Sequence, residues 1–180
     1  MLLGFIQYYS FYNFLVFLPN LLASFYGLSA AQKGLVFLPM SLFLVLGSFT
    51  GGRLQEKSNP RTFLLITSSL NVLATILFVI LSPVSLPVLI VSISLFGLCL
   101  GLSLPVQTTL LARAFTQNRA TAIGVYNFFR YLGMAAGPIF GSVFYQLGNR
   151  VEFLFAAFLF ALTVLFARRQ FTKTDRYQLN

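Results

Sequence analysis

The chain of 180 residues is 58% hydrophobic and only 8% charged, with a mean hydropathy of +0.86 and a net charge of +9. Soluble domains carry charge on about a quarter of their residues, so this composition excludes an ordinary soluble domain and indicates a membrane protein. With one cysteine and no histidine, the chain offers no disulfide, zinc site or His-based catalytic group, and we expect no cofactor, no metal and no enzyme activity.

Six apolar segments follow one another along the chain, each near the ~20 residues that a helix needs to cross the hydrocarbon. They are Leu3–Tyr26, Leu35–Gly52, Thr62–Ser82, Leu86–Ala112, Thr121–Leu147 and Val151–Ala167. None alternates apolar and polar residues, as the strands of a membrane barrel would. We therefore predict an all-α integral membrane bundle of six transmembrane helices over residues 1–168, followed by a basic cytoplasmic tail over residues 169–180.

The basic residues concentrate in alternate breaks between these segments and in the tail. They are Arg53, Lys57, Arg61, Arg113, Arg119, Arg168, Arg169, Lys173 and Arg176, whereas the odd-numbered breaks hold Lys33 and Arg150. The positive-inside rule then places both termini in the cytoplasm, and we expect a multi-pass protein of the bacterial cytoplasmic membrane. The net charge follows from topology and attraction to membrane lipid, so we expect no nucleic-acid partner.

The first segment combines a polar sector with an abrupt start. At 100° per residue its polar side chains Tyr8, Tyr9, Tyr12, Asn13 and Asn20 fall on one side, as expected for the wall of a wet cavity. Alternatively, Tyr8 and Tyr9 anchor the helix at the membrane interface. Because "MLLGFIQYYS" enters the span at once, without a basic leader, we expect a fragment or the product of a split gene.

Small residues recur at four-residue spacing in the second, fourth and fifth segments. They are Gly47 and Gly51, Gly97 and Gly101, and Gly133, Gly137 and Gly141, the last two flanking Pro138. In lipid, such stripes let helix backbones approach each other closely. We expect tight helix packing at these positions, and two readings stay open: packing alone, or faces that move during a transport cycle.

An arginine interrupts the fifth segment. Arg130 lies roughly 13 Å from the start of that segment, too deep to reach the membrane surface easily, so it must face protein or water. Tyr126 and Asn127 lie about one turn away. Arg130 is either a cavity residue that meets substrate or a structural donor to carbonyls near Pro105 or Pro138.

Acidic residues are absent from the interior of every predicted span. Glu56 and Asp175 fall on the cytoplasmic side, and Glu152 falls at the outer end of the sixth segment. We therefore expect that this chain cannot assemble a carboxylate proton relay, and that any titrating acid would belong to another half of the transporter.

Two motifs resemble those of a known family. "GGRLQEKSNPR" resembles the cytoplasmic loop signature of the major facilitator superfamily, with Gly52, Glu56, Lys57 and Arg61 at the matching positions. Asn59 replaces a later glycine of the signature and tolerates a left-handed backbone. "RYLGMAAGPIFG" is similar to the glycine-proline element of the family's drug-proton antiporters.

The resemblance implies the carboxy-terminal half of such a transporter, helices seven to twelve, built as a 3+3 inverted repeat. It implies a cavity lined by the first, second, fourth and fifth segments, and a loop motif that makes and breaks contacts as the halves rock. The predicted substrate contacts are Tyr12, Asn13, Asn20, Gln107, Tyr126, Asn127 and Arg130.

The function implied is secondary active efflux of small amphipathic or drug-like molecules by a half-transporter. Such a half requires a complementary six-helix half or a second copy as its partner. The alternative is a membrane protein that does not transport, either a degenerate half-permease or a subunit whose glycine stripes only mediate packing.

Overall fold

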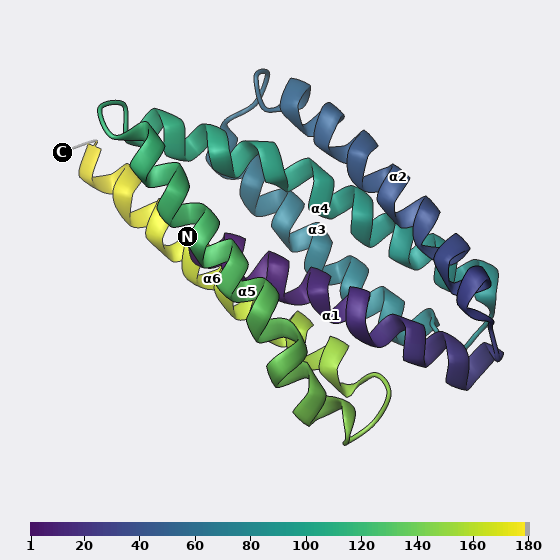
Figure 1. Cartoon of the computed structure of the whole chain (residues 1–180). Helices are drawn as coiled ribbons and strands as arrows, with labels where there is room; N and C mark the ends of the chain where they lie inside the picture. Colours follow the sequence, from purple (N-terminus) through teal and green to yellow (C-terminus); the bar gives the residue numbers. More distant parts are fainter. Residues whose placement is uncertain (179–180) are drawn as a thin grey trace.

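The computed structural model describes residues 1–178, with the side chains of residues 1–171, and these residues form six α-helices and no strand. The helices are α1 (Leu2–Tyr26), α2 (Ala30–Leu54), α3 (Pro60–Leu81), α4 (Leu86–Ala114), α5 (Arg119–Tyr145) and α6 (Val151–Gln178). They run alternately up and down the long axis of the molecule (Figure 1). The predicted all-α bundle is confirmed.

The helix contacts repeat between the two halves of the chain. Helix α2 packs on α4, and in the same way α5 packs on α1. Helix α3 packs on α4, and in the same way α6 packs on α1. Helices α3 and α6 also pack on each other. Each helix of the first three thus has a counterpart in the last three, as a 3+3 repeat requires (Figure 1). This is the arrangement of half of a major facilitator fold.

Glycines make the closest of these contacts. A Cβ added at Gly51 of α2 would lie 2.5 Å from the carbonyl oxygen of Leu102 on α4, and one added at Gly101 of α4 would collide with the carbonyl of Leu44 on α2. On α5, a Cβ at Gly137 would lie 2.8 Å from the Tyr9 carbonyl of α1. At these positions backbone meets backbone, with no room for a side chain.

Local capping sets where the helices begin. Helix α2 begins five residues before the predicted segment because Ser29 and Gln32 form a capping box at its start. Asn59 accepts a hydrogen bond from the Arg61 amide at 3.0 Å and caps α3, with Pro60 as the first helical residue. Asn59 does not use the left-handed backbone that an asparagine tolerates, because its φ is −65°. Helix α6 runs without a break through residue 168, so no structural boundary separates the bundle from the basic segment there.

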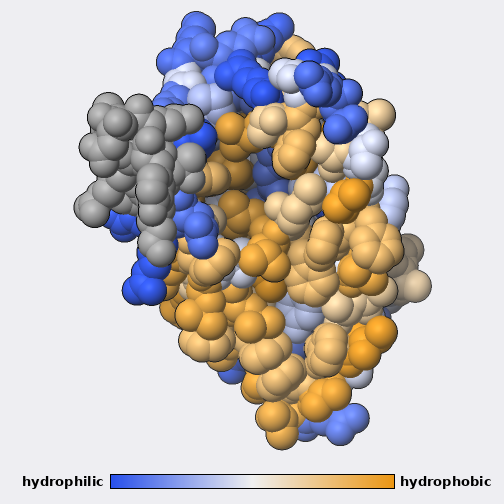
Figure 2. Space-filling model, turned by 90° about the vertical axis from the view of Figure 1, so that its left-hand side faces the viewer, coloured by the Kyte–Doolittle hydropathy of each residue, from blue (hydrophilic) through white to orange (hydrophobic). Residues whose placement is uncertain are grey.

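Four helices are long and apolar enough to cross a membrane by length and composition: α2, α3, α4 and the Val151–Phe171 part of α6. Helices α1 and α5 are of similar length but are not among these four, and they carry the tyrosines, amides and Arg130 noted above. Large apolar side chains such as Leu35, Ile80 and Ile139 lie on the outer surface. Figure 2 shows this surface as a broad apolar band below the hydrophilic residues at the upper end.

The core is centred on Phe14 of α1. Its ring lies 4.8 Å from that of Phe78 on α3, 4.2 Å from that of Phe96 on α4 and 4.8 Å from that of Phe153 on α6. Phe14 is the middle residue of α1, so the first turn of α6 lies beside the middle of α1 and not beside its end.

The topology leads to a first prediction. Both ends of the described chain lie toward the same end of the bundle as the α2–α3 and α4–α5 connections, where the basic residues cluster (Figure 1). We expect reporter fusions at Ser58 and at Gln32 to show opposite sides of the membrane, with Ser58 in the cytoplasm. Reporting from the same side at both positions would contradict the six-helix topology.

Candidate functional site

A chain of buried polar side chains links α5, α4 and α1. The Tyr126 hydroxyl donates to Gln107 Oε1 at 3.1 Å, and Gln107 Nε2 donates to Gln7 Oε1. Gln7 Nε2 donates to Ser103 Oγ at 2.7 Å, and the Ser103 hydroxyl donates to the Leu100 carbonyl at 2.8 Å. Each donor in this series of hydrogen bonds has an acceptor, so these polar groups can be buried without the cost of an unmade hydrogen bond.

Arg130 joins α5 to α1 beside this series of hydrogen bonds. Its Nη1 donates to Asn127 Oδ1 at 3.0 Å, and its Nη2 donates to the Tyr8 hydroxyl. The guanidinium lies 4.1 Å from the centre of the Tyr8 ring and 5.5 Å from that of Tyr126, within cation–π range. The carbonyls near Pro105 and Pro138 that we considered as partners are not among its acceptors, and its buried Nε has no partner.

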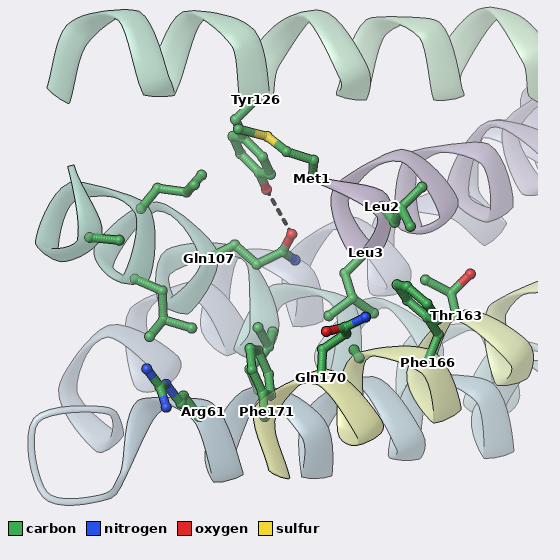
Figure 3. Close-up of a pocket in the computed structure, with 15 residues that line it drawn as sticks. Met1, Leu2, Leu3, Arg61, Gln107, Tyr126, Thr163, Phe166, Gln170 and Phe171 are labelled. Atoms are coloured by element: carbon green, nitrogen blue, oxygen red, sulfur yellow. Dashed lines mark hydrogen bonds between the residues drawn. The ribbon is translucent and has the colours of Figure 1, made fainter. Parts of the chain in front are cut away.

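A cavity of about 470 Å³ opens at the end of the bundle that holds the α2–α3 and α4–α5 connections. Its walls come from the starts of α1 and α3, the ends of α4 and α6, and Tyr126 of α5. This differs from the cavity that the resemblance implied, because α3 and α6 line it and α2 does not. Gln107 and Tyr126 form a hydrogen-bonded polar patch on one wall, and Phe166 and Phe171 of α6 lie on another (Figure 3). Arg61 of α3 also lines it. The cavity is therefore largely apolar, with a few polar groups.

The predicted substrate contacts do not all lie in one place. Gln107 and Tyr126 line the cavity, and Asn127 binds Arg130 on the neighbouring turns of α5. Tyr12 and Asn13 lie in the contact of α1 with α5, where a Cβ at Gly137 would lie 3.4 Å from Tyr12 Cβ. Asn20 is exposed and does not line the cavity.

The loop motif spans the end of α2 and the start of α3. Gly52 lies in the last turn of α2 with open space where a Cβ would be, and Glu56 and Lys57 are exposed in the connection. Arg61 lies in the first turn of α3, with its guanidinium 5.8 Å from the centre of the Phe171 ring. The motif therefore reaches the mouth of the cavity through Arg61.

The three predicted packing glycines of α5 all face α1. Gly133, Gly137 and Gly141 are buried, and a Cβ at Gly141 would lie 2.5 Å from the ring of Phe17 and collide with the Asn13 side chain. Pro138 lies within the same helix and is partly buried. The stripe thus forms the α1–α5 contact that carries Arg130.

Sequence reasoning missed Gln7 and Ser103. Ser103 lies four residues before Gln107, on the same face of α4, and this spacing could have linked the two. Gln7 is a lone amide in an apolar run, and its position does not reveal that it faces α4. Gly4 was missed as well: a Cβ there would lie 2.5 Å from the Tyr126 ring, so this glycine lets α1 approach α5.

The expectation for Glu152 needs correction. We placed it at an outer end and found no acid inside a span, but the structure buries Glu152 completely. Because α6 begins beside the middle of α1, a residue at the start of its apolar segment lies within the bundle. Neither carboxyl oxygen has a hydrogen-bond partner.

Comparison with known proteins agrees with this architecture. The sequence profile of the Major Facilitator Superfamily matches residues 1–178. The chain belongs to the Major Facilitator Superfamily. Its helices and their pairing are those of one half of a member of this superfamily.

Curated relatives in the superfamily include transporters and resistance proteins of Bacillus subtilis. The chain is 30% identical over 134 residues to Multidrug resistance protein 3, covering 71% of this chain and 26% of that protein. It is 26% identical over 149 residues to the Methylenomycin A resistance protein, covering 81% of this chain and 32% of that protein. An uncharacterized MFS-type transporter, YfiU, is 26% identical over 136 residues, covering 74% of this chain and 26% of its own length. The chain thus matches about a quarter to a third of each relative.

The polar chain of this superfamily member gives a second prediction. Tyr126→Phe removes the first donor and leaves Gln107 Oε1 unpaired, so we expect a loss of about 1 kcal/mol in the free energy of unfolding. Tyr131→Phe is the matched control, because Tyr131 is an exposed tyrosine of the same helix. Thermal unfolding in detergent compares the two; an equal effect would show that the hydroxyl of Tyr126 adds nothing.

Proposed function

We propose that this chain is half of a secondary active transporter that exports small amphipathic or drug-like molecules. The observation that carries the proposal is the cavity of about 470 Å³, which has the size and the mainly apolar lining typical of small-molecule sites. The printed names of two relatives, a multidrug resistance protein and a methylenomycin A resistance protein, agree with export of such molecules.

The chemistry of the walls favours a ligand with a large apolar body and a few polar groups. Leucine, phenylalanine, alanine and methionine side chains supply most of the lining, and Gln107 supplies amide hydrogen-bonding groups. Arg61 adds a cation at the α3 wall, with its guanidinium near the Phe171 ring. Apolar contact then provides affinity, and the few polar groups orient the ligand.

A complete transporter requires more than these six helices. In this superfamily the substrate site lies between two six-helix halves. We propose that a complementary half or a second copy of the chain completes the site, in the cytoplasmic membrane of a bacterium. The loop motif lies in the α2–α3 connection, and the α5 glycine stripe packs on α1 within this half.

The absence of tryptophan from the sequence allows a direct test of the cavity. In Phe171→Trp, the new indole replaces a cavity-lining ring, and bound ethidium should quench its fluorescence with a saturable curve. The chain is reconstituted in lipid vesicles, and the quenching curve is measured against ethidium concentration.

Phe158→Trp is the matched control, because Phe158 is an exposed phenylalanine of the same helix and does not line the cavity. We expect only linear quenching there, from dye dissolved in the membrane. Identical curves for the two variants would contradict ligand binding in the cavity and favour the alternative, a membrane protein that does not transport.

A further inference from the structure

The partners of Arg130 are all electrically neutral. Its two hydrogen bonds go to the Tyr8 hydroxyl and to the amide oxygen of Asn127, and its two ring contacts are with Tyr8 and Tyr126. A guanidinium stays protonated in proteins. The positive charge of Arg130 therefore has no negative counterpart among these contacts.

The acidic residues of the chain do not supply that counterpart among the described residues. Glu56 is exposed in the α2–α3 connection. Glu152 is fully buried, but neither of its carboxyl oxygens has a hydrogen-bond partner, so it does not pair with Arg130. Asp175 lies outside the residues whose side chains are described.

A guanidinium with only neutral partners still gains from binding an anion. Charged side chains in membrane spans usually pair with an opposite charge or face a water-filled cavity. Two of the five guanidinium N–H groups of Arg130 donate to Tyr8 and Asn127, and its Nε has no partner. Hydrogen bonds between a guanidinium and an anion are roughly twice as strong as neutral ones, so an anion would bind these donors more strongly than water does.

Arg130 is also near the cavity and is not sealed from it by complete burial. Its side chain is partly buried, and its guanidinium lies 5.5 Å from the ring centre of Tyr126. Tyr126 in turn lines the cavity (Figure 3). None of the described residues that line the cavity is acidic. A molecule whose apolar body fills the cavity would therefore have a cation, and no described carboxylate, beside it.

The aromatic rings disfavour a positively charged ligand at the same place. Organic cations bind to the faces of tyrosine rings. Here the guanidinium itself lies 4.1 Å from the centre of the Tyr8 ring and within cation–π range of Tyr126. A cationic ligand would have to displace Arg130 from both rings or remain beside a like charge.

We propose that Arg130, oriented by Tyr8 and Asn127, is an anion-binding subsite, and that the transported molecule is an amphipathic anion. Its carboxylate or sulfonate binds the guanidinium, and its apolar body lies in the cavity. This assignment of a substrate class rests on the proposed function.

Two amphiphiles with the same octyl chain and opposite charges test the proposal. The Phe171→Trp chain is placed in phosphatidylcholine vesicles with ethidium bound, and octanesulfonate or octyltrimethylammonium is added. We expect octanesulfonate to displace ethidium at a concentration at least about tenfold lower, because one charged hydrogen bond is worth that much. Displacement by the cation at an equal or lower concentration would overturn the anion site and would show that a cation replaces Arg130 at the rings.

Variants of the Phe171→Trp chain locate the preference. Arg130→Gln should abolish it and should also bind ethidium more tightly, because a like charge is gone. Arg119→Gln is the matched control, because Arg119 is an exposed arginine of the same helix, and it should keep the preference. Loss of the preference in both variants would overturn the proposal in favour of surface charge. Arg130→Lys keeps the positive charge and should keep an anion preference, so the test does not depend on the folding of Arg130→Gln alone.

Thermal unfolding in detergent provides a readout without ethidium. Saturating octanesulfonate should raise the melting temperature of the parent chain by about 2 °C or more and leave that of Arg130→Gln unchanged. Phosphatidylglycerol, a lipid with an anionic headgroup, should not reproduce this difference; if it did, the anion would be a lipid and the substrate class would be wrong.

The two readouts separate this inference from the proposed function. Saturable ethidium binding without any preference for the anion would refute the anion subsite and leave the proposed function standing. Stabilisation by octanesulfonate without saturable ethidium binding would support the subsite and contradict ethidium binding in the cavity.

Discussion

The Gly137→Leu chain is expected to fail to fold. A Cβ at this position would lie 2.8 Å from the Tyr9 carbonyl and 3.5 Å from the Asn13 amide nitrogen of α1. Both are backbone atoms, so they cannot move aside unless the whole helix shifts. A branched side chain adds further atoms beyond the Cβ, and we expect a loss of about 3 kcal/mol or more in the free energy of unfolding.

Gly124→Leu is the matched control for this change. Gly124 lies in the same helix, and no atom lies within 4 Å of where its Cβ would be. The two variants are compared by their yield after size-exclusion chromatography in detergent and by their melting temperatures. A Gly137→Leu chain as abundant and as stable as Gly124→Leu would show that α5 does not pack on α1 through this stripe.

The second large effect is expected at Arg130. Its hydrogen bonds go to side chains of Tyr8 and Asn127, and no backbone carbonyl depends on it. We therefore expect Arg130→Ala to lower the melting temperature only slightly. Transport by the complete assembly should fall at least about tenfold, which corresponds to ~1.4 kcal/mol, because the cation that a substrate or a partner acid would meet is gone.

Arg130→Lys separates charge from shape. Lysine keeps the charge but lacks the planar guanidinium that spans two aromatic rings and two acceptors, so only partial recovery of transport is expected. Thermal stability and uptake into vesicles are measured side by side with the complementary half present. Loss of stability in step with loss of transport would indicate that Arg130 is a structural residue.

Much of the fold could be predicted from the sequence because each helix is long, apolar and bounded by turn formers. Helix starts were less predictable. The start of α2 depends on a capping box at Ser29, which lies outside the apolar run that defined the segment. The family could be recognised from short motifs, because the charged residues of the loop between α2 and α3 have the spacing of the major facilitator loop signature.

The site was predicted less completely, because a helical period shows which residues share a face but not what that face meets. Asn20 shares a sector with Asn13, yet one is exposed and the other fully buried. The burial of Glu152 was missed for a related reason. Its place near the start of the sixth apolar segment does not show how deep in the bundle α6 begins. Both properties arise from tertiary packing.

The polar chain between α1 and α4 also has a consequence for biosynthesis. Gln7 finds its partners 96 and 100 residues later, at Ser103 and Gln107. At about 5–20 residues per second, α1 is synthesised roughly 5–20 seconds before α4. During that interval the insertion machinery must hold a helix whose amide has no partner in lipid.

Helix α1 is not among the four helices that are long and apolar enough to cross a membrane, and it carries the amides Gln7, Asn13 and Asn20. We expect it to leave the translocon late and together with α4, not as a free helix. Gln7→Leu should therefore integrate earlier while leaving Ser103 Oγ without its donor in the finished bundle. We therefore expect the hydrogen bonds that Gln7 makes in the mature bundle to influence when α1 enters the membrane.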